Sequence, residues 1–315
     1  MCSVRWRQEM KKNNEKYERS FFMQTKTQWL ENFRCYAEKM ERSLFTSQKS
    51  KKDKTSEINK LIKSYSDEKI LLVQKQAISE KWDNERLLNE ILKITYVSYV
   101  VMLECRNKLR AYEYMDFSRR IGEFWEPFCK LAFKYPLKKL QIIEPRNFEQ
   151  VKQNIKRNAT EYIDSLELSY EIKEELKKLY AIPWTLVNSG GIDLALDLHF
   201  KQGRICYNCD FKSGFHSNEK GNTNRLLLVA SIYKYLGEKT LLFVREENNN
   251  NYFQTLKNSN YWEVYCAADC YAAIKSFTGF DIRAWLNNNV NWEQDISQEL
   301  KTHLQANGLL KYLTW

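Results

Sequence analysis

Two acidic residues and one lysine are spaced so that a β-sheet could bring them together. Asp210 and Lys212 are two positions apart in a run, 205–212, whose composition is typical of a strand. Residues two apart on a strand share a face, so these side chains should project together. Asp193 lies in a second apolar run, 192–200, that should pair with the first. The sequence therefore predicts two carboxylates and one ammonium within a few ångströms.

This combination suits a hard divalent cation and a phosphodiester. Two carboxylates can hold Mg²⁺, which keeps several waters and binds phosphate oxygens. The cation polarises the phosphoryl group and lowers the pKa of a bound water. A lysine beside it can orient that water and offset the growing negative charge. We expect Asp193 and Asp210 to bind Mg²⁺, with Mn²⁺ able to substitute, and Lys212 to position the water.

The identity of the first acid has an alternative. Asp197 has the same parity as Asp193 along the strand but lies deeper in it. Gly190 and Gly191 precede Asp193, and glycines let backbone and metal approach closely. These glycines favour Asp193.

A zinc site is a second possibility in this region. Cys206 and Cys209 have a C-x-x-C spacing, and Cys266 and Cys270 could complete four ligands. On a strand, however, an odd offset points the first two thiols to opposite faces. We therefore expect reduced, buried thiols instead of a zinc site.

Helices should surround the strands. Helical spacing runs over 5–45 and 57–114, with a polar run, 47–56, predicted as a loop between them. A helix is expected over 116–133, and more helix through Tyr180. No stretch has the roughly 20 apolar residues of a membrane span.

The apolar period then changes from 3.6 to 2, which confines the predicted sheet to about 183–265. Gly203 lies in the turn between the second and third strands, and Gly237 should end a helix over 225–236. The predicted strands are 183–187, 192–200, 205–212, 240–245 and 262–265.

The elements indicate an α/β protein with a mixed central sheet flanked by helices. A large helical N-terminal region should cover 1–115, a catalytic core 116–246, and a mostly helical region, 247–315, should complete the core. The N-terminal helices could embrace DNA or form a dimer contact.

The spacing of Asp193, Asp210 and Lys212 resembles the PD-(D/E)xK nuclease superfamily, and within it the type II restriction endonucleases. In that family one strand presents an acid, the next strand presents (D/E)-x-K, and a helix and a further strand follow. Gly191 and Ile192 stand in place of the usual proline before the first acid. The resemblance implies a restriction-endonuclease-like fold and hydrolysis that leaves 5′-phosphate and 3′-hydroxyl ends.

Two further segments are similar to restriction enzymes. Glu126, in the predicted helix, matches a glutamate that helps hold metal or water in the family, with Glu123 as the alternative. Because Pro127 follows, we expect Glu126 at a helix start or a kink. The segment after Lys212 is similar to a DNA-contacting loop. Its candidate contacts are Ser213, His216, Lys220, Asn222, Asn224 and Arg225.

The expected partner is double-stranded DNA. The formal charge is +10, from 50 Lys and Arg against 40 Asp and Glu, and a basic chain favours polyanions. A palindromic site would require a homodimer. We expect a cytoplasmic protein without membrane contact or nucleotide cofactor. The alternatives are a repair, recombination or RNA-processing nuclease of the same fold, and a non-catalytic DNA- or protein-binding helical protein.

Overall fold

A computed structural model describes residues 24–187, 193–215 and 220–315. The chain divides into two compact units. A helical unit contains the chain up to Lys138 together with Ile274–Trp315, and a sheet unit contains Lys139–Ala273. These bounds differ from the expected divisions after residues 115 and 246, because the last helices complete the helical unit and not the sheet.

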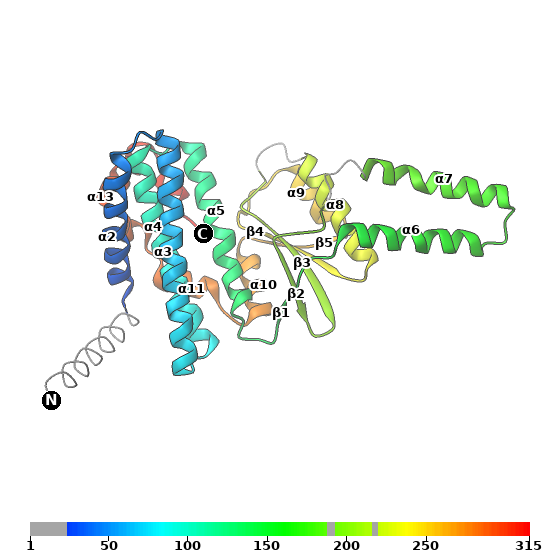
Figure 1. The fold of residues 1–315 in the computed structure, drawn as a ribbon, viewed down its shortest axis with the longest axis horizontal. Helices are drawn as coiled ribbons and strands as arrows, with labels where there is room; N and C mark the ends of the chain where they lie inside the picture. Colours follow the sequence, from blue (N-terminus) through cyan, green and yellow to red (C-terminus); the bar gives the residue numbers. More distant parts are fainter. Residues whose placement is uncertain (1–23, 188–192, 216–219) are drawn as a thin grey trace, which may run out of the picture. The chain divides into compact units, whose positions relative to one another are not determined.

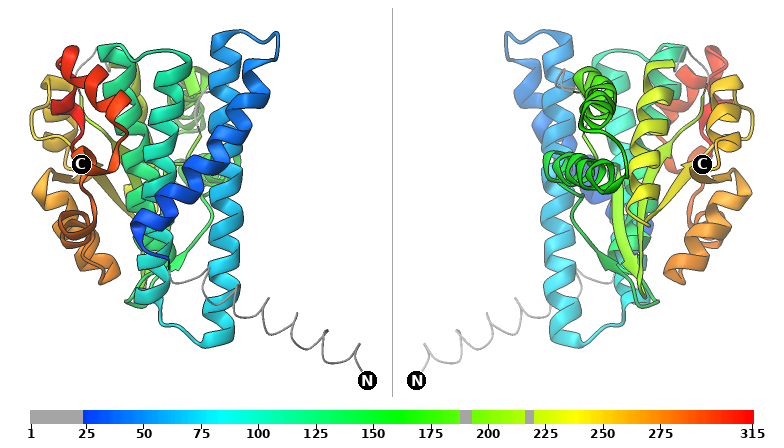
Figure 2. Two further views of the ribbon diagram at one scale, coloured as in Figure 1. Left: turned by 90° about the vertical axis from the view of Figure 1, so that its left-hand side faces the viewer. Right: turned by 90° about the vertical axis from the view of Figure 1, so that its right-hand side faces the viewer.

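The helical unit is built from long helices that lie side by side (Figure 1), and α2 runs obliquely across the others (Figure 2). None of the helices in the described residues is long and apolar enough to cross a membrane. The helices of this unit are α2 (Lys26–Phe45), α3 (Lys51–Glu80), α4 (Asn84–Leu109), α5 (Tyr114–Lys134), α11 (Ile282–Asn289), α12 (Trp292–Asp295), α13 (Gln298–Ala306) and η1 (Leu310–Tyr312).

The C-terminal residues pack into the middle of this bundle. Tyr96 of α4 is fully buried and meets Trp292 and Trp315 edge to face, at ring-centroid distances of 4.9 and 6.4 Å. The Tyr96 hydroxyl donates to Asp295 at 2.8 Å. Because these partners lie about 200 positions further along the chain, the bundle is complete only with its C-terminal segment.

One expectation for the helical unit was wrong, and a second was wrong as to the helix start. The polar run 47–56 was expected to be a loop, but α3 begins at Lys51 because the Ser50 side chain caps it by accepting from the Asp53 N–H. Pro127 was expected to place Glu126 at a helix start or a kink. Pro127 instead lies inside α5, and Glu126 is in the middle of that helix.

The sheet unit has a five-stranded mixed sheet in the order β1-β2-β3-β4-β5. The β1–β2 and β2–β3 pairs are antiparallel, and the β3–β4 and β4–β5 pairs are parallel. The strands are β1 (Gln141–Ile142), β2 (Leu198–Gln202), β3 (Ile205–Lys212), β4 (Lys239–Val244) and β5 (Trp262–Cys266). The general α/β class is therefore as predicted, with Gly203 at φ +62° in the β2–β3 turn.

Helices cover this sheet and extend from it. Helix α8 links β3 to β4, and Leu226 and Ala230 of α8 pack on Leu242 and Val244 of β4. Helices α6 and α7 form an antiparallel pair that projects away from the strands (Figure 1). The helices are α6 (Phe148–Ser165), α7 (Tyr170–Val187), α8 (Lys220–Tyr235), α9 (Asn251–Asn258) and α10 (Ala268–Thr278), the last of which spans the division between the units.

Three strand predictions were wrong. Residues 183–187 form the end of α7, where the Thr185 hydroxyl bonds back to Ile182 O at 2.8 Å. The run 192–200 is a strand only from Leu198, and residues 188–192 lie outside the described part of the chain. A short edge strand, β1, lies well before the expected start of the sheet.

Candidate active site

The β2–β3 hairpin brings Asp197, and not Asp193, to Asp210. Leu198 pairs with Cys209 in the antiparallel register, so one further step places Asp197 opposite Asp210. The Asp197 carboxylate accepts from the Phe211 backbone N–H at 2.7 Å, which fixes it at the mouth of the hairpin. Cross-strand neighbours lie on the same face. Asp197, Asp210 and Lys212 therefore share one face of the sheet.

Asp193 lies elsewhere. It precedes β2 and is exposed, and its carboxylate accepts from the Ala195 backbone N–H at 2.9 Å. A short aspartate next to its own backbone makes such local turns readily, and this one competes with strand formation. The expectation that Asp193 lies beside Asp210 is therefore wrong, and Asp197, the alternative acid, takes that position. Gly190 and Gly191, on which that choice rested, lie outside the described residues.

Asp210 and Lys212 form an ion pair inside the protein. Lys212 Nζ lies 2.7 Å from Asp210 Oδ2, and the Asp210 side chain is only 2% exposed against 24% for Lys212. At this distance the Lys212 ammonium is the charged partner that offsets the burial of the Asp210 carboxylate. A buried carboxylate is costly unless a cation compensates its charge, and a metal ion could share that role with Lys212.

The protonation of the pair follows from burial. Burial raises the pKa of Asp210 to about 7, and Asp197 adds to this shift while Lys212 opposes it. Burial alone would lower the pKa of Lys212, but the Asp210 charge outweighs burial and the net shift is upward. Lys212 is therefore an ammonium that can donate and stabilise negative charge.

Helix α8 explains why this polar face is buried. In the parallel register Asp210 pairs with Leu242 and Lys212 with Val244, and α8 packs on both β4 residues. Arg225 of α8 also acts electrostatically on Lys212 and tends to lower its pKa. The Asp210–Lys212 pair is therefore not an ordinary surface salt bridge on a strand that faces solvent.

The predicted DNA contacts have different surroundings. Ser213 follows Lys212, and its hydroxyl accepts from Arg245 Nη2 at 2.8 Å. Lys220 and Asn224 are exposed at the start of α8, and Asn222 and Arg225 are half-buried there. His216 lies outside the described residues.

A buried polar chain continues along the same face of β3, and sequence reasoning missed it. His199 Nδ1 lies 2.7 Å from Asn208 Oδ1, Asn208 Nδ2 donates to Glu238 at 2.9 Å, and Arg146 pairs with Glu238 at 2.7 Å. The Leu196 N–H donates to His199 Nε2, so Nδ1 carries the proton. Burial lowers the pKa of His199 and keeps it neutral, which indicates a structural role. The signal in the sequence was Asn208, a polar residue two positions before Asp210 and therefore on the same face of the strand.

Glu126 and Glu123 belong to the helical unit. Glu126 pairs with Lys130 at 3.0 Å, and Glu123 pairs with Arg120 at 2.8 Å. The metal-assisting role of Glu126 stays a prediction.

Thiols offer no alternative centre in the described residues. Cys206 and Cys209 are both free on β3, where their odd offset separates them across the sheet, and Cys209 is buried. Among the described residues no cluster of three or more His, Cys, Asp or Glu side chains could hold a metal by itself. A cation here would take Asp197 and Asp210 and complete its shell with water and substrate.

No family model matches this chain, and no curated protein or solved structure matches it.

Proposed function

We propose that the chain is a Mg²⁺-dependent endonuclease of the PD-(D/E)xK type that hydrolyses double-stranded DNA. The observation that carries the proposal is the convergence of Asp197, Asp210 and Lys212 on one sheet face. The order of strands, with an antiparallel hairpin followed by a helix and a parallel strand, agrees with what that resemblance implies. A site-specific restriction activity is the form that we propose.

The residues fit a magnesium ion. Mg²⁺ is usually bound by one or two carboxylates and retains waters that substrate phosphates can replace. Asp210 offers a buried carboxylate whose Oδ2 meets the Lys212 ammonium, and the half-buried Asp197 offers a second carboxylate beside it. When bound, the ion would polarise the scissile phosphate and acidify a water.

Each side chain has a distinct task in this proposal. Asp197 and Asp210 hold the cation. The Lys212 ammonium orients the attacking water and stabilises the negative charge that develops on the phosphate. Arg225 and the backbone N–H groups at the start of α8 hold the neighbouring phosphate, because a helix N-terminus attracts anions.

The substrate assignment rests on charge and on the family resemblance. The formal charge of +10 favours a polyanion, and basic side chains gain affinity by releasing counterions from phosphates. We propose that the protein acts as a homodimer on a palindromic site, with products carrying 5′-phosphate ends.

The test is incubation of a supercoiled plasmid with the full chain and Mg²⁺ or Mn²⁺, followed by end sequencing. Discrete fragments with one shared end sequence support a restriction enzyme. Cleavage only of branched, single-stranded or RNA substrates would assign the same centre to repair or RNA processing. DNA binding without cleavage on any substrate, unchanged by Lys212→Ala, would reject catalysis.

A further inference from the structure

A pocket lies inside the helical unit, between α3, α4 and α5, with a volume of about 680 Å³. This is within the range of pockets that bind small molecules. The residues of α3 that line the pocket recur at helical spacing, and most of them are polar. They include Lys52, Ser56, Asn59, Lys60 and Lys63. A face that packed on another helix would carry apolar residues at these positions. The pocket therefore favours a polar occupant.

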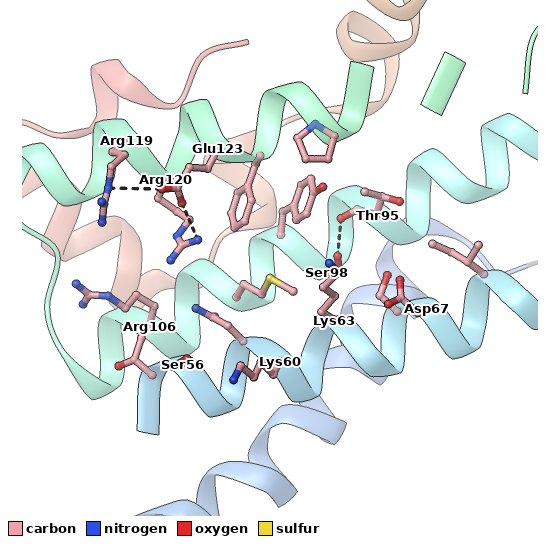
Figure 3. A pocket seen from close by; sticks show the side chains of 18 of the residues that line it. Ser56, Lys60, Lys63, Asp67, Thr95, Ser98, Arg106, Arg119, Arg120 and Glu123 are labelled. Atoms are coloured by element: carbon pink, nitrogen blue, oxygen red, sulfur yellow. Dashed lines mark hydrogen bonds and ion pairs between the residues drawn. The ribbon is translucent and has the colours of Figure 1, made fainter. Parts of the chain in front are cut away.

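Positive charge dominates the lining. Eight basic side chains line the pocket against three acidic ones, Asp67, Asp116 and Glu123. Figure 3 shows Lys60 from α3, Arg106 from α4 and Arg119 and Arg120 from α5 around the same end of the pocket. The basic residues are Lys52, Lys60, Lys63, Arg106, Arg110, Arg119, Arg120 and Lys134.

The acidic residues neutralise only part of this charge. Asp116 pairs with Arg106 at 3.0 Å and lies 3.5 Å from Arg110, and Glu123 pairs with Arg120. Lys60 and Lys63 are exposed and form no ion pair with any described residue. Like charges held together without counterions repel, so an anion in the pocket would be stabilised by several of them at once.

Arg106 is the strongest single indication of a ligand. It is 6% exposed, and its Nη2 donates to Asp116 while its guanidinium stacks on Tyr112 with the carbon 4.6 Å from the ring centroid. Its Nη1 is buried and has no hydrogen-bond partner among the described residues. A buried guanidinium N–H without an acceptor is costly, and a phosphate oxygen is a strong acceptor for arginine.

The rest of the lining suits an organic group attached to the anion. Asn59 Oδ1 and Thr95 Oγ1 are buried and also lack partners in the described part of the chain. Tyr99 and Phe124 contribute a stacked aromatic pair, with ring centroids 4.1 Å apart. Free hydrogen-bonding atoms beside aromatic rings are the usual complement of a ring-bearing polar molecule.

We propose that this pocket binds a small organic phosphate, a nucleotide-sized molecule whose phosphoryl groups are held by Arg106 and the lysines of α3. A DNA backbone is a less suitable occupant, because the phosphates of a duplex run along the outside of a wide rod and Arg106 is buried at the pocket wall. The ligand would act as an effector or second substrate of the protein, independently of the carboxylates on the sheet.

Calorimetric titration of the full chain in EDTA tests this site without any dependence on cleavage. Inorganic pyrophosphate and ADP should bind, with ADP tighter, and binding should weaken as salt rises because counterions compete. Adenosine, which lacks the phosphates, should bind at least ~10-fold more weakly than ADP, as expected when charged contacts carry the affinity. Adenosine binding equal to ADP, or no binding of either phosphate, would overturn the proposal.

Variants locate the site. Lys60→Ala/Lys63→Ala removes two exposed cations and should weaken ADP binding ~10-fold or more, since each charged hydrogen bond contributes strongly. Lys51→Ala/Lys75→Ala, two exposed lysines of α3 outside the lining, is the matched control and should bind like the wild type. Equal ADP affinity in the two double variants would overturn the assignment, and so would a loss of DNA affinity in the pocket variant without any phosphate binding.

Discussion

Asp197 Oδ2 lies 2.7 Å from the backbone nitrogen of Phe211, directly across the hairpin from Asp210. This hydrogen bond links the first carboxylate to the strand that carries the second, so the two acids keep their spacing when a cation enters. Preorganised ligands bind metal without reorganising at the moment of reaction. The same contact distinguishes Asp197 from Asp193, whose carboxylate accepts from the backbone N–H of Ala195, two residues further on.

Replacement of the two candidate acids should give opposite results. Asp197→Ala removes a metal ligand and should lower Mg²⁺-dependent plasmid cleavage by roughly 10²-fold or more, the usual effect of losing one electrostatic partner of a transition state. Asp193→Ala should cleave at the wild-type rate. Loss of cleavage with Asp193→Ala alone would restore the first assignment, and initial rates on one plasmid substrate decide between them.

Lys212→Met should lower the cleavage rate while DNA binding persists. The methionine keeps the aliphatic stem but cannot orient water or stabilise charge, so we expect a rate lower by roughly 10²-fold. Lys239→Met is the matched control, because Lys239 also ends in an ion pair on the sheet, with Glu263 at 2.7 Å, but is exposed. If both variants lost activity equally, the effect would come from the sheet and not from the centre.

Asn208→Ala should destabilise the protein without touching the proposed metal ligands. The substitution leaves the buried His199 and Glu238 groups without their shared partner, which should cost about 2–4 kcal/mol of unfolding free energy. Urea denaturation measures the change. Asn224→Ala, at an exposed position, should stay within about 0.5 kcal/mol of the wild type. A neutral Asn208→Ala would show that the polar chain does not stabilise the fold.

Asp281 gives a pH dependence whose sign is fixed. It pairs with Lys275 and caps α11 by accepting from the Ala284 N–H, and these contacts lower its pKa. A lowered pKa means that the stabilisation is present above the unfolded-state pKa and is lost as pH falls through the folded-state pKa. Asp281→Asn keeps the cap but not the charge. Its loss of unfolding free energy relative to the wild type should therefore shrink as the pH falls below about 4.

For comparison, Asp281→Ala loses the cap as well. It should remain destabilised by about 1 kcal/mol even in acid, the usual value of an N-cap side chain. Unfolding free energies of both variants and the wild type across the acid range measure this. A pH-independent difference between Asp281→Asn and the wild type would show that the Lys275 ion pair contributes nothing.

The strand that carries Asp210 and Lys212 could be predicted well from the sequence, but the segment that leads into β2 could not. Strand β3 and the shared face of Asp210 and Lys212 follow from alternation alone, because a period of two leaves no choice of side. The start of β2 does not follow, because alternation continues through Asp193, whereas the strand begins only at Leu198 and the Asp193 carboxylate accepts from the Ala195 N–H. Register, which decides between Asp193 and Asp197, depends on pairing over the whole hairpin.

Among the helices too, some features follow from local sequence and others do not. Long helices such as α4 were predicted from their spacing, but the end of α7 was predicted as a strand because Thr185 and Val187 are strand-forming types. Charged pocket residues gave no signal, because Lys60 and Arg106 are distant in sequence and converge only when α3 packs on α4. Tertiary packing supplies this information, and local propensity does not contain it.

The sheet unit is one uninterrupted stretch of chain, whereas the helical unit is split around it. During synthesis the sheet unit is therefore complete while the bundle still lacks Trp292, Asp295 and Trp315, the partners of Tyr96. Tyr96 of α4 therefore gains these partners only after residues 292–315 have been synthesised. A chain truncated after the sheet unit would leave the side of α4 around Tyr96 uncovered, and exposed apolar surface of this kind is recognised by chaperones and proteases.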